Sequence, residues 1–129
     1  MTPDELLEHA MKARENAVAT FSRFKVGAAL LTSAERVYTG CNIENSTYGL
    51  TVCAERVALW KALSDGERSF ARIAVASGGE RPATPCGACR QLLWEFCGDL
   101  EVVLGNASGV KEIHHLAGLF PRPFDQSSL

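Results

Sequence analysis

The sequence predicts an α/β domain over residues 1–129, in which helices pack in layers on a mixed five-stranded sheet. Strand-like and helix-like segments alternate twice in the middle of the chain. The run at 70–76 is apolar without polar alternation, which is typical of a strand covered on both faces. Right-handed crossovers between such strands produce a parallel part of the sheet with helices packed on it. We expect one domain, because no linker, repeat or low-complexity tract divides the chain.

The N-terminal third is expected to form a helix followed by a hairpin. A capping-box pattern at Thr2 begins the helix, and apolar residues at helical spacing continue to Val18, so we expect the helix to end just before Phe21. Two β-rich segments, 24–32 and 36–43, are separated by a short turn and predict an antiparallel pair.

The rest of the chain is expected to alternate between helices and strands. In order, we predict a helix from Cys53 to about Ser64, a strand at 70–76, a helix from Cys86 to about Cys97, and strands at 100–104 and 110–114. The helix after Cys53 is apolar nearly all round, so it needs cover on nearly every side. We infer that a second subunit supplies part of this cover, although long loops of the same chain are an alternative.

Composition limits the classes of partner and the compartment. The formal net charge is −2 with a pI near 5.9, and Lys and Arg do not cluster, so the chain lacks the basic surface of a nucleic-acid binder. We expect neither a secretory signal nor a membrane span, and therefore a cytoplasmic protein. An odd number of cysteines, five, fits a disulfide framework poorly and favours metal binding or catalysis.

Three cysteines and one glutamate form the candidate reactive site. Cys53 is followed two residues later by Glu55, and Cys86 and Cys89 have C-x-x-C spacing, each motif opening a helix. If both helices begin at the same sheet edge, the carboxyl ends of adjacent parallel strands bring the motifs into one crevice. Three thiolates can hold Zn²⁺ and leave its fourth tetrahedral position for water. Glu55 would then move protons as a general acid and base. A nearly identical pattern characterises zinc nucleobase deaminases.

Charge compensation at such a site is expected from Arg56. Three thiolates and one Zn²⁺ carry a net charge of −1, which opposes ionisation of a bound water. Helix dipoles offset part of this charge, and hydrogen bonds from Arg56 to the sulfurs would offset more. Arg90, beside Cys89, is a second candidate for the same role.

Two other uses of the cysteines remain open on the residues alone. A closed structural zinc site needs a fourth ligand, and Cys97 lies roughly 12 Å beyond Cys89 along a continuous helix, too far to share the ion. A thioredoxin-like redox pair would explain Cys86 and Cys89 but leaves Cys53 and Glu55 unexplained.

The sequence resembles the small, homotetrameric, zinc-dependent cytidine deaminases, both in the two metal motifs and in two further runs of residues. The matching runs, all in family order, are Phe21-Ser22-Arg23-Phe24-Lys25-Val26-Gly27-Ala28-Ala29-Leu30, Gly40-Cys41-Asn42-Ile43-Glu44-Asn45, Cys53-Ala54-Glu55-Arg56 and Pro85-Cys86-Gly87-Ala88-Cys89-Arg90-Gln91. The resemblance implies a three-layer α-β-α sandwich. It also implies one zinc ion per subunit, held by Cys53, Cys86 and Cys89, with Glu55 as proton carrier.

The resemblance further implies how a nucleoside is held. Asn42 and Glu44 are expected to bind the ribose hydroxyls, Phe24 to form a wall against the base, and the backbone near Ala54 and Thr84 to contact the pyrimidine. Tyr48 and Phe124 are expected to enter a neighbouring subunit's site. The chain departs from the family pattern at Phe21, where Tyr is commoner, at 46–47, and at 114–118.

The activity implied is hydrolytic deamination of cytidine and 2′-deoxycytidine in pyrimidine salvage. Alternatives are a related zinc deaminase for another aminated heterocycle, a nucleic-acid editing enzyme, and a zinc-stabilised binding module. Asn42 and Glu44 argue against the first and the acidic composition against the second. A binding module would have no use for an open metal position.

Overall fold

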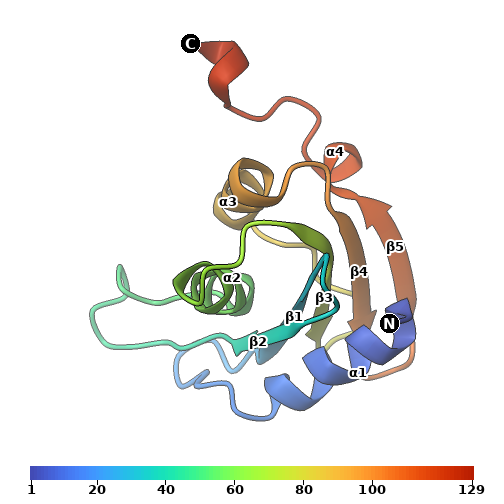
Figure 1. The fold of residues 1–129 in the computed structure, drawn as a ribbon. Coiled ribbons are helices and arrows are strands. Elements are labelled where there is room, and N and C mark those ends of the chain that lie inside the picture. Colours follow the sequence, from blue (N-terminus) through green and yellow to red (C-terminus); the bar gives the residue numbers. More distant parts are fainter.

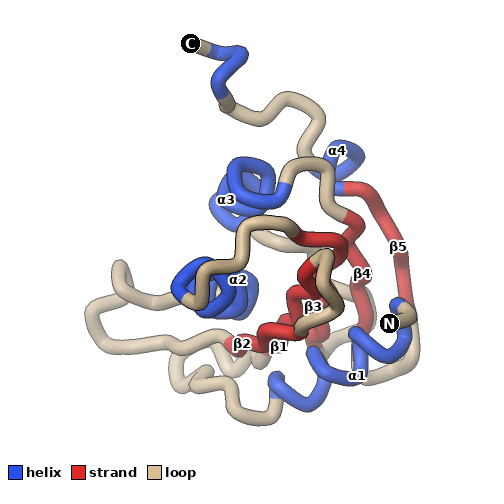
Figure 2. Tube along the Cα trace, viewed as in Figure 1, coloured by secondary structure: helices blue, strands red, loops and turns tan.

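The computed structural model describes all of residues 1–129. Its elements, in chain order, are α1 (Pro3–Arg14), β1 (Val26–Thr32), β2 (Val37–Cys41), α2 (Ala54–Ser64), β3 (Phe70–Ser77), α3 (Gly87–Cys97), β4 (Glu101–Asn106), β5 (Lys111–His115), α4 (Leu116–Leu119) and the 3₁₀ turn η1 (Gln126–Ser128). The five strands form one sheet in the order β2-β1-β3-β4-β5 (Figure 2). Of its four pairs, only β3 with β4 is parallel, so the predicted mixed sheet and the hairpin of β1 and β2 are confirmed.

Helices cover both faces of the sheet, which makes three layers. Figure 1 shows α1 on one side of the strands and α2 and α3 on the other. The larger core joins α2 and α3 to one face through residues such as Leu59, Leu93 and Val75, whereas the smaller core joins α1 to the opposite face through Leu6 and Ala74. Alternate residues of a strand point to opposite faces, so β3 contributes to both cores. The three-layer α-β-α sandwich is therefore confirmed.

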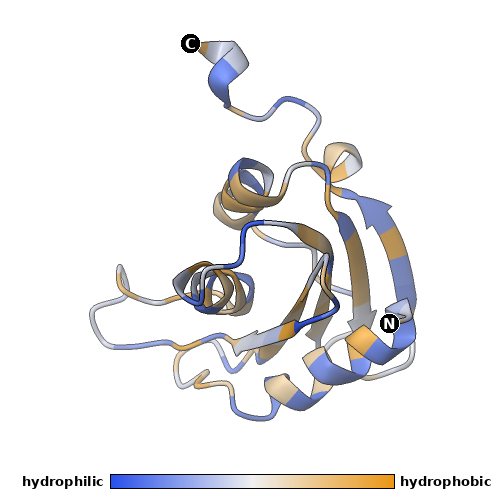
Figure 3. Cartoon of the chain, in the orientation of Figure 1, coloured by the Kyte–Doolittle hydropathy of each residue, from blue (hydrophilic) through white to orange (hydrophobic).

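The central strand β3 is buried as its sequence predicts. Residues 73–76 are at most 2 % exposed, and Figure 3 shows apolar colour on β3 and β4 but polar colour on most of the edge strand β5. β3 lies between β1 and β4 with helices over each face, so residues 73–77 are buried, whereas its first three residues are partly or fully exposed.

The first helix begins as predicted but ends earlier. Thr2 and Glu5 exchange capping-box hydrogen bonds, whereas α1 stops at Arg14 rather than just before Phe21. Val18 instead lies in an isolated bridge with Ile43, and its backbone bonds the backbone of residues 42 and 44. These long-range pairings compete with helix formation after Arg14. The apolar spacing does not reveal them, so the predicted helix was too long.

Close contact with the hairpin fixes the start of α2. A Cβ atom at Gly40 of β2 would lie 2.5 Å from the Ala54 carbonyl oxygen and 2.6 Å from the Ala58 nitrogen. Only a residue without a side chain allows the first turn of α2 to approach β2 this closely. The position of Cys53 and Glu55 is thereby tied to the register of the hairpin.

Two buried polar side chains fix the loop between β3 and α3. Asn106, at the end of β4, donates to the carbonyl oxygens of Gly79 and Glu80, at 3.0 Å each, and accepts from the Val110 nitrogen at 2.9 Å. Ser77, at the end of β3, accepts from the Ala83 nitrogen at 3.1 Å. The loop that leads to Cys86 is thus held at the carboxyl ends of the two parallel strands.

Two segments extend away from the layered body. The loop between β2 and α2 projects from one side, and the chain after α4 leaves the other end of the molecule (Figure 1). None of the helices combines the length and apolar character needed to cross a lipid bilayer.

Candidate active site

The two cysteine motifs open α2 and α3 at one end of β3. Cys53 and Cys86 are the N-cap residues of these helices, and both have extended backbone angles. The predicted shared edge is confirmed, but the strands before the two helices are not adjacent as expected. β2 and β3 run in the same direction on either side of β1, which is antiparallel to both. The two helix N-termini still meet in one crevice, where their partial positive charge favours thiolates.

The three cysteine sulfurs form a compact cluster that fits a zinc ion. Their Sγ atoms all lie within 4.8 Å of one another, and those of Cys53 and Cys86 are 3.9 Å apart. In a tetrahedral site with Zn–S bonds near 2.3 Å, neighbouring sulfurs lie about 3.8 Å apart. Cys97 is outside the cluster, as its spacing predicts. Three soft ligands with no fourth protein ligand match an open zinc site.

Two thiols of the cluster, Cys53 and Cys89, have pKa values shifted in opposite directions. Hydrogen bonding from Cys89, reinforced by Arg56, lowers the pKa of Cys53 to about 5 even though burial opposes ionisation. The same contact with Cys53, together with burial, raises the pKa of Cys89. The Cys53 thiol is therefore ionised at neutral pH before any metal binds, whereas Cys89 would need a bound cation to ionise.

Arg56 lies beside the cluster as predicted. Its Nη2 donates to the Cys53 sulfur at 3.2 Å, while its buried Nε has no hydrogen-bond partner within the chain. A partly buried guanidinium that donates to sulfur offsets thiolate charge. Arg90 does not reach a sulfur. It donates to the carbonyl oxygens of Pro85, at 2.7 Å, and Leu119, at 2.6 Å, and to the Thr84 hydroxyl at 2.8 Å.

Replacing Arg56 by alanine is expected to weaken zinc binding about 10–100-fold, because partners of metal ligands typically contribute that much. Zinc affinity measured by competition with a chromophoric chelator checks the change, and the far-ultraviolet circular dichroism spectrum checks that the fold is intact. Arg68→Ala is a matched control, since Arg68 bonds only the backbone of residues 63 and 67. Unchanged zinc affinity and turnover in Arg56→Ala would remove the role assigned to this arginine.

Glu55 is a buried carboxyl in the first turn of α2. It is 5 % exposed, and burial, with a smaller contribution from the negative charge of Cys53, raises its pKa to about 7. A carboxyl with a pKa near neutral both accepts and returns a proton readily. The charge of Glu55 also raises the pKa of Cys89, which is in keeping with a position of this carboxyl close to the sulfurs.

One cavity of about 260 Å³ is lined by two cysteines of the cluster, Cys53 and Cys86, and by most of the predicted binding residues. Its lining comprises Ser22, Phe24, Val26, Asn42, Glu44, Thr51, Val52, Cys53, Ala54, Glu55, Val75, Ala83, Thr84 and Cys86. The lining is mainly apolar. Its polar groups include Glu55, the sulfurs of Cys53 and Cys86, and the side chains of Asn42 and Glu44. A small apolar site with a few convergent polar groups is typical of small-molecule binding.

Asn42 and Glu44 organise the loop at 21–26 as well as line the cavity. Asn42 accepts from the Val26 nitrogen at 2.8 Å and donates to the Phe24 carbonyl oxygen at 2.9 Å. Glu44 accepts from the nitrogens of Phe21 and Ser22 and from the Ser22 hydroxyl, and these contacts, led by Ser22, lower its pKa. Ser22 is a cavity residue that the sequence did not indicate, because no spacing predicts a contact between residues 22 and 44.

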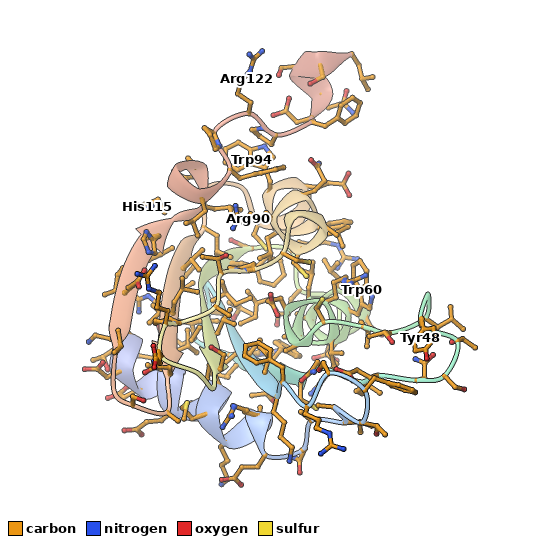
Figure 4. All side chains as sticks on the ribbon, turned by 180° about the vertical axis from the view of Figure 1, so that it is seen from behind. Tyr48, Trp60, Arg90, Trp94, His115 and Arg122 are labelled. Carbon is orange, nitrogen blue, oxygen red and sulfur yellow. The ribbon has the colours of Figure 1, made fainter.

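Tyr48 and Phe124 lie outside this cavity. Tyr48 lies on the projecting loop (Figure 4) and is 69 % exposed. Its ring packs edge-on against Phe21 with centroids 5.2 Å apart. Phe124 is 60 % exposed in the C-terminal segment, where Gln91 bonds its backbone. Neither ring reaches the site of its own chain, so their predicted entry into a neighbour's site stays a prediction.

Residues 1–106 match the family model described as the cytidine and deoxycytidylate deaminase zinc-binding region. This chain belongs to that deaminase family. Among its curated relatives, the cytidine deaminase of Sporosarcina psychrophila is 48 % identical over 130 residues, covering 100 % of this chain and 96 % of the relative. The probable cytidine deaminase of Dictyostelium discoideum is 52 % identical over 122 residues, covering 91 % of this chain and 82 % of the relative.

Solved structures of deaminases agree with this membership. The cytidine deaminase from Burkholderia pseudomallei superposes with a TM-score of 0.93 at 49 % identity, covering 96 % of this chain and 100 % of that one. The cytidine deaminase from Mycobacterium tuberculosis superposes with a TM-score of 0.83 at 35 % identity, covering 97 % and 98 %. The deaminase fold predicted from the sequence is thus confirmed.

Proposed function

We propose that the protein is a zinc-dependent cytidine deaminase that converts cytidine and 2′-deoxycytidine to uridine and 2′-deoxyuridine with release of ammonia, in pyrimidine salvage. One observation carries the proposal: a buried carboxyl, Glu55, lies beside an open three-thiolate cluster in the same cavity as Asn42 and Glu44. The 48 % identity to a cytidine deaminase along the whole chain supports it.

In the proposed mechanism, Cys53, Cys86 and Cys89 would hold a zinc ion, which would supply a Lewis acid able to make water a nucleophile near neutral pH. Glu55 takes a proton from the attacking water and gives it to N3 of the ring while oxygen adds to C4. Glu55 then transfers a second proton from the added hydroxyl to the amine, which leaves C4 as ammonia. The backbone at Ala54 and Thr84 orients the ring.

The remainder of the cavity is assigned to substrate binding. Phe24 supplies a wall for the base, and Asn42 and Glu44 supply hydrogen bonds for the ribose hydroxyls. Tyr48 and Phe124 complete a neighbouring subunit's site. Their exposed rings on projecting segments support this assignment.

We propose further that residues 1–129 act as one domain in a cytoplasmic homotetramer with sites shared between subunits. The exposed pair of Trp60 and Phe96, from α2 and α3, supports assembly because large apolar side chains on adjacent helices favour a protein interface (Figure 4). Five free cysteines are in keeping with a reducing compartment. Analytical ultracentrifugation of the purified protein tests the tetramer.

The experiment that tests the function is ultraviolet detection of cytidine loss and uridine gain, before and after metal is stripped and zinc restored. We expect zinc-dependent conversion of cytidine and of 2′-deoxycytidine. A folded, zinc-loaded protein that converts neither would contradict the proposal, and a panel of other aminated heterocycles would then identify the amine it does accept.

A further inference from the structure

The loop at 21–26 forms one wall of the cavity, and only its last residue, Val26, belongs to a strand. Arg23 within it has a φ angle of 57°, in the left-handed region, and Phe24 at the cavity is 42 % exposed. Backbone strain of this kind persists only where surrounding contacts enforce it. The position of Phe24 therefore depends on the side-chain hydrogen bonds that hold the loop.

The Ser22 hydroxyl makes two of these contacts at once. It donates to Oε2 of Glu44 and accepts from the Phe24 nitrogen at 3.0 Å. The Ser22 backbone nitrogen also donates to Oε1 of Glu44 at 2.9 Å. One small side chain thus connects the carboxylate assigned to the sugar with the backbone of the aromatic residue assigned to the base.

The acceptor positions of Glu44 are largely used by this chain. A carboxylate has about four lone-pair sites. Oε1 accepts from the nitrogens of Phe21 and Ser22, and Oε2 accepts from the Ser22 hydroxyl and, at the longer distance of 3.5 Å, from Asn42 Nδ2. The carboxylate is fixed in orientation before substrate arrives, with only the Asn42 contact weak enough to give way to a ribose hydroxyl.

We propose that Ser22 is a positioning residue, whose hydroxyl couples the sugar-binding carboxylate of Glu44 to the base wall at Phe24. The proposal rests on the proposed function, because it assigns Glu44 and Phe24 to a nucleoside. Loss of the hydroxyl would release Glu44 Oε2 and the Phe24 nitrogen together, so sugar and base contacts would weaken in one step. Cys53, Cys86, Cys89 and Glu55 make no hydrogen bond to Ser22, so the chemical step would be spared.

Ser22→Ala and Ser22→Thr test the role of the hydroxyl. For Ser22→Ala we expect KM for cytidine and the Kd of the product uridine to rise about tenfold, as for loss of a hydrogen bond to a charged group, with kcat within about twofold of wild type. Ser22→Thr, which keeps the hydroxyl, should restore most of the affinity. The matched control is Ser33→Ala. Ser33 lies in the turn between β1 and β2, and this substitution removes a hydroxyl that is hydrogen-bonded to the Ser69 hydroxyl.

A double-mutant cycle tests the coupling itself. In a Glu44→Gln background, we expect the additional effect of Ser22→Ala on uridine Kd to fall from about tenfold to about twofold or less. An equal effect in both backgrounds would overturn the coupling. The proposal would also be overturned if Ser22→Ala left uridine Kd unchanged, lowered only the melting temperature, or lowered kcat at constant KM.

Calorimetric binding of uridine separates this proposal from the proposed function. If wild type binds uridine but does not convert cytidine, the function fails while the Ser22 effect on Kd still decides the positioning role. If wild type converts cytidine and Ser22→Ala does so with wild-type KM and Kd, the function stands and the positioning role fails. A wild type that neither binds uridine nor converts cytidine overturns both.

Discussion

Glu55→Gln is expected to retain zinc and fold but to lower kcat for cytidine by about 10²–10⁴-fold, the usual contribution of a general acid and base. Glutamine has nearly the same shape as glutamate but cannot accept and return a proton. The native carboxyl is suited to both steps, because burial raises its pKa to about 7, near the working pH. Steady-state kinetics together with zinc content by atomic absorption check the expectation.

The control for this substitution is Glu95→Gln, which neutralises an exposed glutamate of α3 that lies outside the cavity. This variant should keep wild-type turnover. Substantial activity in Glu55→Gln, with zinc bound and the fold unchanged, would mean that another group carries the proton. A loss of zinc would instead make Glu55 a contributor to metal binding, contrary to the assignment above.

Cys89→Ala is expected to lose both zinc and turnover. Cys89 is 1 % exposed at the centre of the cluster, and its removal leaves two sulfurs 3.9 Å apart, which hold a zinc ion far less tightly than three. Because metal that binds only the folded chain adds to folding stability, the variant should also melt at a lower temperature. Metal analysis and thermal unfolding with and without a chelator measure the two effects.

Cys97→Ala is the matched control on the same helix. Cys97 lies outside the metal cluster, and burial raises its pKa to about 12, so its thiol is neutral at physiological pH. The melting temperature of wild type and of Cys97→Ala should fall when a chelator is added, whereas that of Cys89→Ala should not respond. A full zinc content in Cys89→Ala would show that the ion is held by a different set of ligands.

Local signals in the sequence were sufficient for most elements of the fold. The capping box at Thr2 and the apolar run at β3 depend on neighbouring residues, and both predictions are confirmed. The predicted end of α1 was wrong, because Val18 lies outside the helix and its backbone pairs with residues 42–44. Such a pairing joins distant parts of the chain and leaves no trace in helical spacing.

The site residues also divide into those that local motifs predict and those that depend on contacts between distant parts of the chain. Motif spacing predicted the cluster of Cys53, Cys86 and Cys89, because two of them are helix N-caps and the third lies in the first turn of α3. Ser22 and Arg90 act through loop backbone, whose conformation depends on contacts far along the chain. Because Arg90 follows Cys89 in the sequence, it was a candidate to offset the charge of the sulfurs. In the structure it instead hydrogen-bonds Pro85, in the loop before Cys86, and Leu119, at the end of α4.

The placement of β1 between β2 and β3 makes the metal site depend on pairings between distant parts of the chain. Cys53 and Cys86 follow the two strands that lie on either side of β1, and the β1–β3 register joins residues as distant as Ala28 and Val75. Such non-local pairing is slow to form, because a long loop must close before its contacts stabilise it. We therefore expect the complete set of three sulfurs to form late in folding, so that zinc would enter a nearly finished protein rather than guide its assembly.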